Sequence, residues 1–62
     1  MQVITEVNGY KFGLNDAPEV VAALPEEKRY MIEEPDGETF VGNRKGIARM
    51  FNRLAGANVP EQ

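Results

Sequence analysis

The chain has 62 residues and a formal net charge of −3, with 42% hydrophobic and 27% charged residues and no Cys, His, Trp or Ser. This composition excludes disulfides, thiolate metal sites and the usual Ser–His or Cys–His nucleophiles, and the length allows one small domain of modest stability. The longest apolar run, residues 20–24, is too short to span a bilayer, and the first residues do not resemble a signal peptide, so we expect a soluble, cytoplasmic module without catalytic or cofactor-binding residues.

Residues 3–14 predict a β-hairpin. Asn8-Gly9 suits the two residues of a type I′ turn, because both tolerate positive φ. A two-residue loop would pair Val7 with Tyr10, Thr5 with Phe12 and Val3 with Leu14. Under that register one face of the hairpin carries Val3, Val7, Tyr10, Phe12 and Leu14.

A short helix should follow the first hairpin. Asp16 can cap it, Pro18 is tolerated in its first turn, and Glu19 completes a capping box. Apolar residues continue to Leu24, and Pro25 should end the helix because the residue before a proline leaves the helical region.

Residues 29–42 predict a second hairpin. Pro35-Asp36-Gly37 suits a type I turn with Gly in the left-handed region, which gives a three-residue loop with a bulge. This register pairs Ile32 with Phe40 and Tyr30 with Gly42. A two-residue loop would place Ile32 and Phe40 on opposite faces, so we favour the bulged form.

Asn43 should cap a second helix that runs to Ala55, with Gly56 as its terminator. Its apolar face has the spacing of an amphipathic helix, with Ile47, Met50, Phe51 and Leu54 at i, i+3, i+4 and i+7. We expect residues 1–56 to form the single domain and residues 57–62 a flexible C-terminal tail.

The predicted order is ββαββα, an α+β fold in which a four-stranded antiparallel sheet carries two helices on one face. An echo at a spacing of 28 residues suggests an internal pseudo-repeat. Five residues recur identically at this spacing: Ile4, Glu6, Gly9, Phe12 and Asn15 correspond to Ile32, Glu34, Gly37, Phe40 and Asn43.

Charges of opposite sign are segregated along the chain. Residues 1–42 carry nine acids and three bases, whereas residues 43–56 carry four bases and no acid. One hypothesis is that an acidic face binds a partner through Glu26, Glu27, Glu33, Glu34, Asp36, Glu38, Arg29 and Tyr30. The alternative is a nucleic-acid or anion site on the second helix, formed by Arg44, Lys45, Arg49 and Arg53. Either set also reads as ordinary solvated surface.

A metal site has little support in the sequence. Glu33 and Glu34 are neighbours on a strand and point to opposite faces, so they cannot share an ion. Glu34, Asp36 and Glu38 would supply oxygen ligands, but calcium sites need more converging ligands than three. We therefore expect no bound metal.

In size, acidity, lack of cysteine and single-domain form, the chain resembles the small proteins encoded by bacteriophages and mobile elements, including anti-CRISPR proteins. The resemblance carries no sequence motif and transfers no functional position. It implies a non-enzymatic inhibitor that binds a host defence complex and blocks its access to nucleic acid, in the bacterial cytoplasm. Alternatives are a small nucleic-acid-binding or regulatory module, for which the negative net charge is unfavourable, and a structural or dimerising module. A homodimer is an option that exposed strand edges allow.

Overall fold

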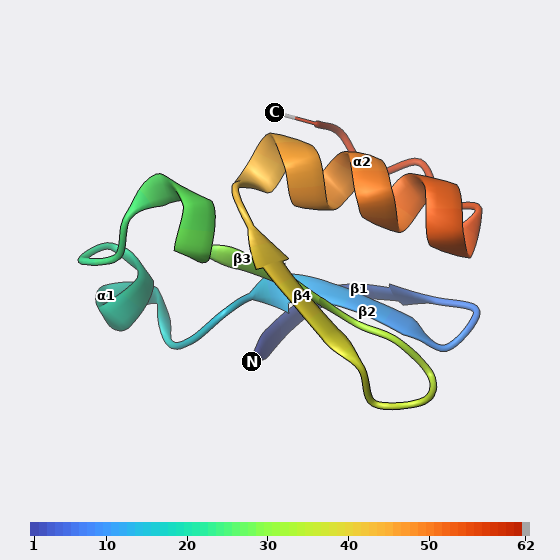
Figure 1. Ribbon diagram of the computed structural model, residues 1–62, viewed down its shortest axis with the longest axis horizontal. Helices are drawn as coiled ribbons and strands as arrows, with labels where there is room; N and C mark the ends of the chain where they lie inside the picture. Colours follow the sequence, from blue (N-terminus) through green and yellow to red (C-terminus); the bar gives the residue numbers. More distant parts are fainter. Residues whose placement is uncertain (62) are drawn as a thin grey trace.

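The computed structural model describes residues 1–61, which form one antiparallel sheet, two α-helices and a 3₁₀-helix (Figure 1). The elements in chain order are β1 (Gln2–Val7), β2 (Tyr10–Leu14), α1 (Pro18–Val21), η1 (Glu26–Lys28), β3 (Tyr30–Glu33), β4 (Thr39–Gly42) and α2 (Arg44–Ala55). The four strands lie in the order β1-β2-β3-β4, so each pairs with its neighbour in sequence. The predicted α+β class and four-stranded antiparallel sheet are confirmed.

Helix α2 lies across one face of the sheet and contacts β2, β3 and β4 (Figure 1). Phe12 from β2, Ile32 from β3 and Phe51 from α2 are the largest fully buried side chains between these two layers. Burying a side chain of this size contributes about 1.5–3 kcal/mol, so these three residues account for much of the stability of the domain.

The ends of α2 follow the prediction. Asn43 Oδ1 accepts a hydrogen bond of 2.7 Å from the backbone N–H of Gly46, and Gly56 is left-handed with φ of 69°. The buried side of the helix differs in one respect. Leu54 is 37% exposed, and the small side chains of Ala48 and Ala55 are buried beside Ile47 and Phe51 instead.

The first hairpin confirms the predicted turn and two of the three predicted pairs, Val7 with Tyr10 and Thr5 with Phe12. Asn8 and Gly9 both have positive φ, as a type I′ turn requires, and Thr5 pairs with Phe12. Between Val3 and Thr5 a bulge shifts the register, so Val3 pairs with Gly13. The expected position of Val3 opposite Leu14 is therefore wrong, because the extra residue cannot be read from alternation alone. Val3 and Ile4 are 47% and 53% exposed.

The second hairpin has the predicted register. Ile32 pairs with Phe40, and Tyr30 pairs with Gly42. The three-residue loop closes with a hydrogen bond of 2.8 Å from the Glu34 N–H to the Glu38 carbonyl oxygen. Gly37 has a φ of 91°, which a residue with a side chain rarely adopts.

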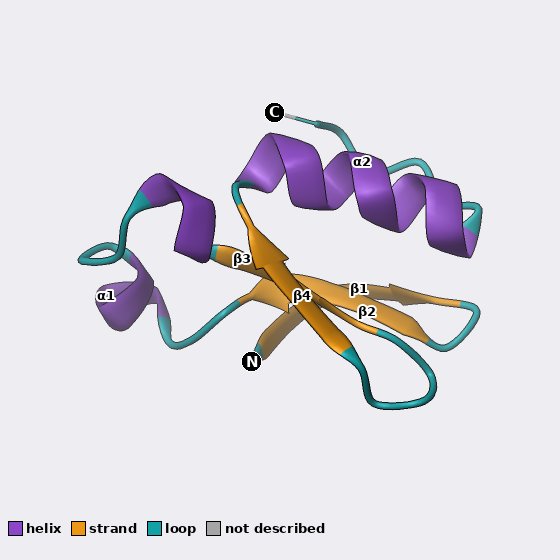
Figure 2. Cartoon of the chain, in the orientation of Figure 1, coloured by secondary structure: helices purple, strands orange, loops and turns teal. Residues whose placement is uncertain are grey.

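The segment between the hairpins is less helical than predicted. Helix α1 spans only four residues and its N-cap is Ala17, which no side chain of the described residues 1–61 caps. The predicted capping box does not form, because Asp16 Oδ1 accepts from the adjacent Ala17 N–H at 2.7 Å. The 3₁₀-helix η1 was not predicted. Helix α1 lies beyond the end of the sheet rather than over its face, so within residues 1–61 α2 is the helix that covers the sheet (Figure 2).

Residues 57–61, which we expected to belong to a flexible tail, fold back against α2 (Figure 1). Asn52 makes two hydrogen bonds to Val59: its side-chain N–H donates to the Val59 carbonyl at 2.8 Å, and its Oδ1 accepts from the Val59 N–H at 2.7 Å. Ala57 and Val59 also pack against the core. We call residues 57–61 the C-terminal strap. Residue 62, the last of the predicted tail, lies outside the described residues.

The internal pseudo-repeat stays a prediction, because equivalent positions differ in burial and in hydrogen bonding. Ile32 is fully buried, whereas Ile4 is exposed at the bulge. Asn43 caps α2, whereas the Asn15 side chain donates to the Lys28 carbonyl at 3.0 Å. The two turns also have different lengths.

Within residues 1–61, no helix has the length and apolar character needed to span a bilayer.

Candidate functional site

The loop between β3 and β4 brings three acidic side chains together: Glu34, Asp36 and Glu38, which we call the acidic turn. The backbone of the loop is held by hydrogen bonds from the Gly37 N–H to the Glu34 carbonyl at 2.9 Å and from the Glu38 N–H to Asp36 Oδ1 at 2.9 Å. Asp36 thus helps to form the turn, as short Asx side chains commonly do.

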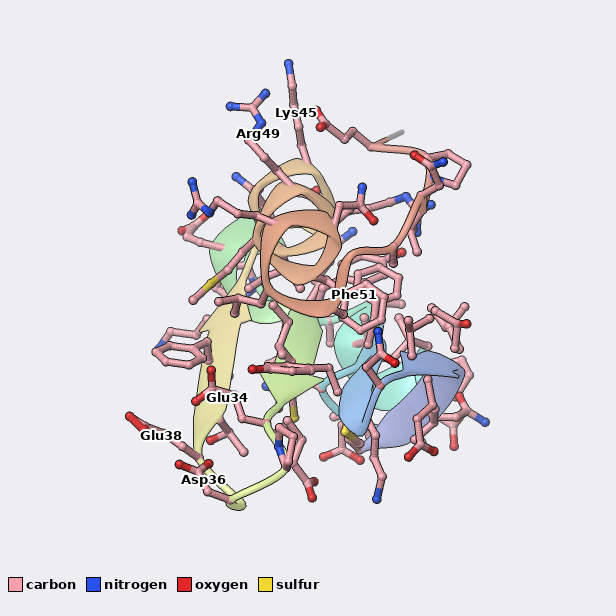
Figure 3. All side chains as sticks on the ribbon, turned by 90° about the vertical axis from the view of Figure 1, so that its right-hand side faces the viewer. Glu34, Asp36, Glu38, Lys45, Arg49 and Phe51 are labelled. Atoms are coloured by element: carbon pink, nitrogen blue, oxygen red, sulfur yellow. The ribbon has the colours of Figure 1, made fainter. Side chains whose placement is uncertain are left out.

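The acidic turn concentrates negative charge. One carboxylate oxygen from each of its three residues lies within 4.8 Å of the others. The pKa of Glu34 is raised above its ordinary value, first by partial desolvation and then by the charges of Asp36 and Glu38. In residues 1–61, no Lys or Arg forms an ion pair with any of the three. Figure 3 shows the acidic turn at the opposite end of the molecule from Lys45 and Arg49.

The acidic turn could offer three oxygen ligands to a cation. Asp36 and Glu38 are exposed, however, and calcium is commonly held by six to eight oxygens, roughly twice what these three side chains supply with one oxygen each. The geometry therefore adds nothing to the expectation from the sequence, and the absence of a metal site stays a prediction.

The remaining predicted acids do not join the acidic turn. Glu33 lies on the opposite face of β3 and forms an ion pair of 3.9 Å with Lys11. Glu26 and Glu27 lie in η1, at the other end of β3, where Glu26 pairs with Arg29 at 3.5 Å. Exposed pairs of this kind contribute about 0–1 kcal/mol to stability. The predicted acidic face is therefore divided into separate groups.

Arg29 and Tyr30, which we expected to anchor a partner, are held in contacts within the chain. Arg29 Nε donates to the Leu24 carbonyl at 2.9 Å and so closes the segment after α1. The Tyr30 ring stacks on Phe12 with centroids 5.9 Å apart. Tyr30 lies on the buried side of the sheet because it shares a face with Ile32, two residues further along β3.

The four bases of α2 are also divided. The Arg44 guanidinium lies 5.8 Å from the Phe12 ring centroid and 5.5 Å from that of Tyr30, and it donates to the Pro60 carbonyl at 3.2 Å. Cation–π contacts of this kind stabilise a cation by about 0.5–2 kcal/mol, which offsets its unfavourable position in the first helical turn. Arg49 pairs with Glu61 of the strap at 3.2 Å.

Several structural roles were missed from the sequence. Asn52 holds the strap, and the Asn8 side chain donates to the Ala55 carbonyl at 2.8 Å, which ties the first turn to the end of α2. A weak signal existed for Asn52, since Asn is a poor helix former in the middle of a helix. Nothing in the sequence pattern pairs Asn8 with a residue so distant along the chain.

No protein-family model, curated protein or solved structure matches this chain. Function must therefore be inferred from the surface. Of the eight residues predicted for the acidic face, the structure brings three together without neutralising them. Of the four predicted bases, Lys45 and Arg53 are exposed and form no ion pair within residues 1–61.

Proposed function

We propose that this protein is a non-enzymatic inhibitor that binds a positively charged surface of another protein through its acidic turn. The observation that supports the proposal is the gathering of Glu34, Asp36 and Glu38 at one hydrogen-bonded hairpin end, with no ion-paired base among residues 1–61. A surface that binds nucleic acid presents Lys and Arg to phosphate, so it would attract the acidic turn in the same way.

The proposed target is a nucleic-acid-binding defence complex of a bacterial host, as the resemblance to phage and mobile-element inhibitors implies. In that role the acidic turn would occupy part of the groove that receives DNA or RNA. Complementary charge mainly accelerates association, so the inhibitor should act most strongly at low salt. The protein would act in the bacterial cytoplasm, where such complexes work.

The experiment uses a triple variant, Glu34→Gln, Asp36→Asn and Glu38→Gln, which removes the charge while keeping the shape of the side chains. Binding of a purified guide-RNA-loaded nuclease complex to its DNA target is measured with and without the protein at several salt concentrations. We expect the parent protein to inhibit DNA binding, and the triple variant to inhibit it weakly, through slower association with the nuclease complex.

A matched control removes the same charges elsewhere. The variant Asp16→Asn, Glu19→Gln and Glu27→Gln alters one Asp and two exposed Glu residues away from the acidic turn. It should inhibit as the parent does. Equal inhibition by the triple variant of the acidic turn, or no inhibition by the parent across the main classes of nuclease complex, would refute the proposal.

The basic surface of α2 provides the competing explanation. Two of its four bases, Arg44 and Arg49, are engaged by the strap and the core. Among residues 1–61 this leaves Lys45 and Arg53 outside such contacts, too few cations for tight binding to nucleic acid, since affinity grows with the number of phosphates neutralised. Direct binding of the parent protein to labelled DNA or RNA at low salt, lost in an Arg53→Glu variant, would favour that explanation over ours.

A further inference from the structure

The sheet has a second face, opposite α2, which carries a row of small and apolar residues. The strand pairings align four residues directly across the sheet: Val3, Gly13, Met31 and Val41. Val3 and Val41 are 47% and 46% exposed, and Met31 is half-buried. Within residues 1–61, α2 packs on the other face, and α1 and η1 lie at the end of the sheet (Figures 1 and 2). We call this second surface the open face.

A row of polar residues lies beside the apolar row on the open face. The pairings align Glu6, Lys11, Glu33 and Thr39, one from each strand. The two central strands therefore carry opposite charges side by side, and Lys11 Nζ lies 3.9 Å from a Glu33 carboxylate oxygen. Each row thus has a defined order from β1 to β4, which determines how the face can match a copy of itself.

A two-fold axis parallel to the strands, running between β2 and β3, makes the open face self-complementary. Such an axis places β2 of one copy over β3 of the other, and β1 over β4. Lys11 then faces Glu33 of the second copy, and Val3 faces Val41 of the second copy, each contact occurring twice. Symmetric dimers use one patch on both subunits in this way, and packed sheets with nearly aligned strands lie about 10 Å apart.

The perpendicular orientation does not match. A two-fold axis in the plane of the sheet but across the strands would place each strand over itself and reverse its direction. If that axis lay midway between the rows, the charged row would lie over the apolar row, and the Lys11–Glu33 ion pair would be desolvated against Gly13 and Met31 with no further polar partner. If it lay along the charged row, Lys11 would face Lys11 of the second copy and Glu33 would face Glu33. Desolvating an ion pair against apolar residues, or placing like charges opposite each other, is unfavourable. The charges of the open face therefore select one of the two simple face-to-face arrangements.

We propose that a second copy of this chain docks on the open face, around an axis parallel to the strands, to form a face-to-face homodimer. An axis in this direction keeps both copies pointing the same way along their strands. Both acidic turns consequently lie at the same end of the dimer. A dimer would present two acidic turns to one target and bind it more tightly than a monomer, through a higher effective concentration of the second turn.

The first test measures the mass of the full chain by sedimentation equilibrium from micromolar to millimolar concentration. We expect the parent to shift from monomer to dimer as concentration rises. Val41→Asp should raise the dissociation constant by about tenfold or more, because it places an unpaired charge in the interface. Val20→Asp is the matched control, since Val20 is 44% exposed but lies on α1, and it should dimerise as the parent does.

The second test separates contacts between copies from the ion pair within each copy. Lys11→Glu and Glu33→Lys should each weaken self-association, because each gives the central strands two like charges. An equimolar mixture of the two variants should restore a dimer, since one chain then presents acids where the other presents bases. Circular dichroism and urea unfolding check that each variant is folded.

Three outcomes would overturn the dimer: a parent chain that is monomeric at all concentrations, a Val41→Asp variant that dimerises as well as Val20→Asp, or a charge mixture that gains nothing. If the parent is monomeric but Val41→Asp weakens inhibition of the nuclease complex, the open face binds a different protein. The acidic-turn variant should still dimerise, so failure of the inhibitor proposal and failure of the dimer remain distinguishable.

Discussion

Gly13 is the position where a single methyl group should matter most. A Cβ atom added there would overlap the backbone carbonyl oxygen of Gln2 and would lie 2.9 Å from the Cα of Val3. Both obstacles are backbone atoms of β1, so no side-chain rotation can relieve them. The Gly13→Ala variant must therefore push the first half of β1 away from β2 or distort the central strand.

The expected loss follows from the nature of the obstacle. Extra atoms in a packed region destabilise proteins by about 1–3 kcal/mol, and contact with backbone places this case at the upper end of that range. A chain of 62 residues has a total stability of about 3–9 kcal/mol. A loss of about 3 kcal/mol would lower the melting temperature by roughly 12–24 °C.

Gly42→Ala provides the matched control, because its Cβ would meet only Ile47, with Cγ1 at 3.2 Å and Cδ1 at 3.3 Å. The Ile47 side chain can shift, and a Gly→Ala change also gains about 0.4–1 kcal/mol by restricting the unfolded chain. Urea unfolding followed by circular dichroism measures both variants, and hydrogen exchange shows whether β1 detaches. If Gly13→Ala is as stable as Gly42→Ala, the close approach of β1 to β2 is wrong.

Two further predictions concern the strap and the acidic turn. Asn52→Ala should remove both hydrogen bonds to Val59, destabilise the domain by about 1–3 kcal/mol in urea and speed amide exchange at Val59, and unchanged exchange would show that Asn52 does not hold the strap. The pKa of Glu34 is raised in the folded state, so the fold favours the protonated carboxyl over the ionised one. The protonated carboxyl therefore adds to the stability of the domain at acid pH, and this contribution is lost as pH rises through the raised pKa. Glu34→Gln should therefore raise the melting temperature at neutral pH, with the gain shrinking at acid pH, and a lower melting temperature at neutral pH would contradict this reasoning.

The parts of the fold that the sequence predicted are those with a local chemical signal. Asn8-Gly9 predicts a type I′ turn, and Pro35-Asp36-Gly37 predicts a bulged one. Asn43 and Gly56 mark the two ends of α2. Each signal lies within a few residues of its effect. Alternation of apolar residues then sets which side of β3 and β4 faces the core.

The parts that were missed depend on contacts between distant segments. The bulge in β1 exists where the chain passes close to Gly13, ten residues further along, and alternation carries no trace of it. Arg44 lies in the first turn of α2 because its guanidinium contacts two aromatic rings of the sheet. Asn52 lies in the middle of α2 because its side chain binds the C-terminal strap. The length of helix α1 was overestimated because Asp16 does not form the predicted capping box. Its side chain instead accepts a hydrogen bond from the adjacent Ala17 N–H.

In the candidate site, too, the local groupings were predictable and the long-range contacts were not. Glu34, Asp36 and Glu38 are close in sequence and meet on one turn, so their grouping was predictable. The separation of Glu26 and Glu27 from them was not, because it depends on η1 lying at the far end of β3. Arg29 and Tyr30 were assigned to a partner because their own intramolecular contacts, with Leu24 and Phe12, were not visible from composition.

Folding alone does not explain the charge of the acidic turn. The loop needs Gly37 for its positive φ and benefits from Asp36, whose side chain accepts from the Glu38 N–H. Within residues 1–61, the carboxylates of Glu34 and Glu38 form no hydrogen bond or ion pair that holds the loop. The pKa of Glu34 is raised, first by desolvation of its carboxyl and then by the charges of Asp36 and Glu38, so its ionised form is disfavoured in the fold. These two charges therefore reduce the stability of a small, marginally stable domain. They become favourable when a partner places positive charges opposite them, as the proposed binding surface would.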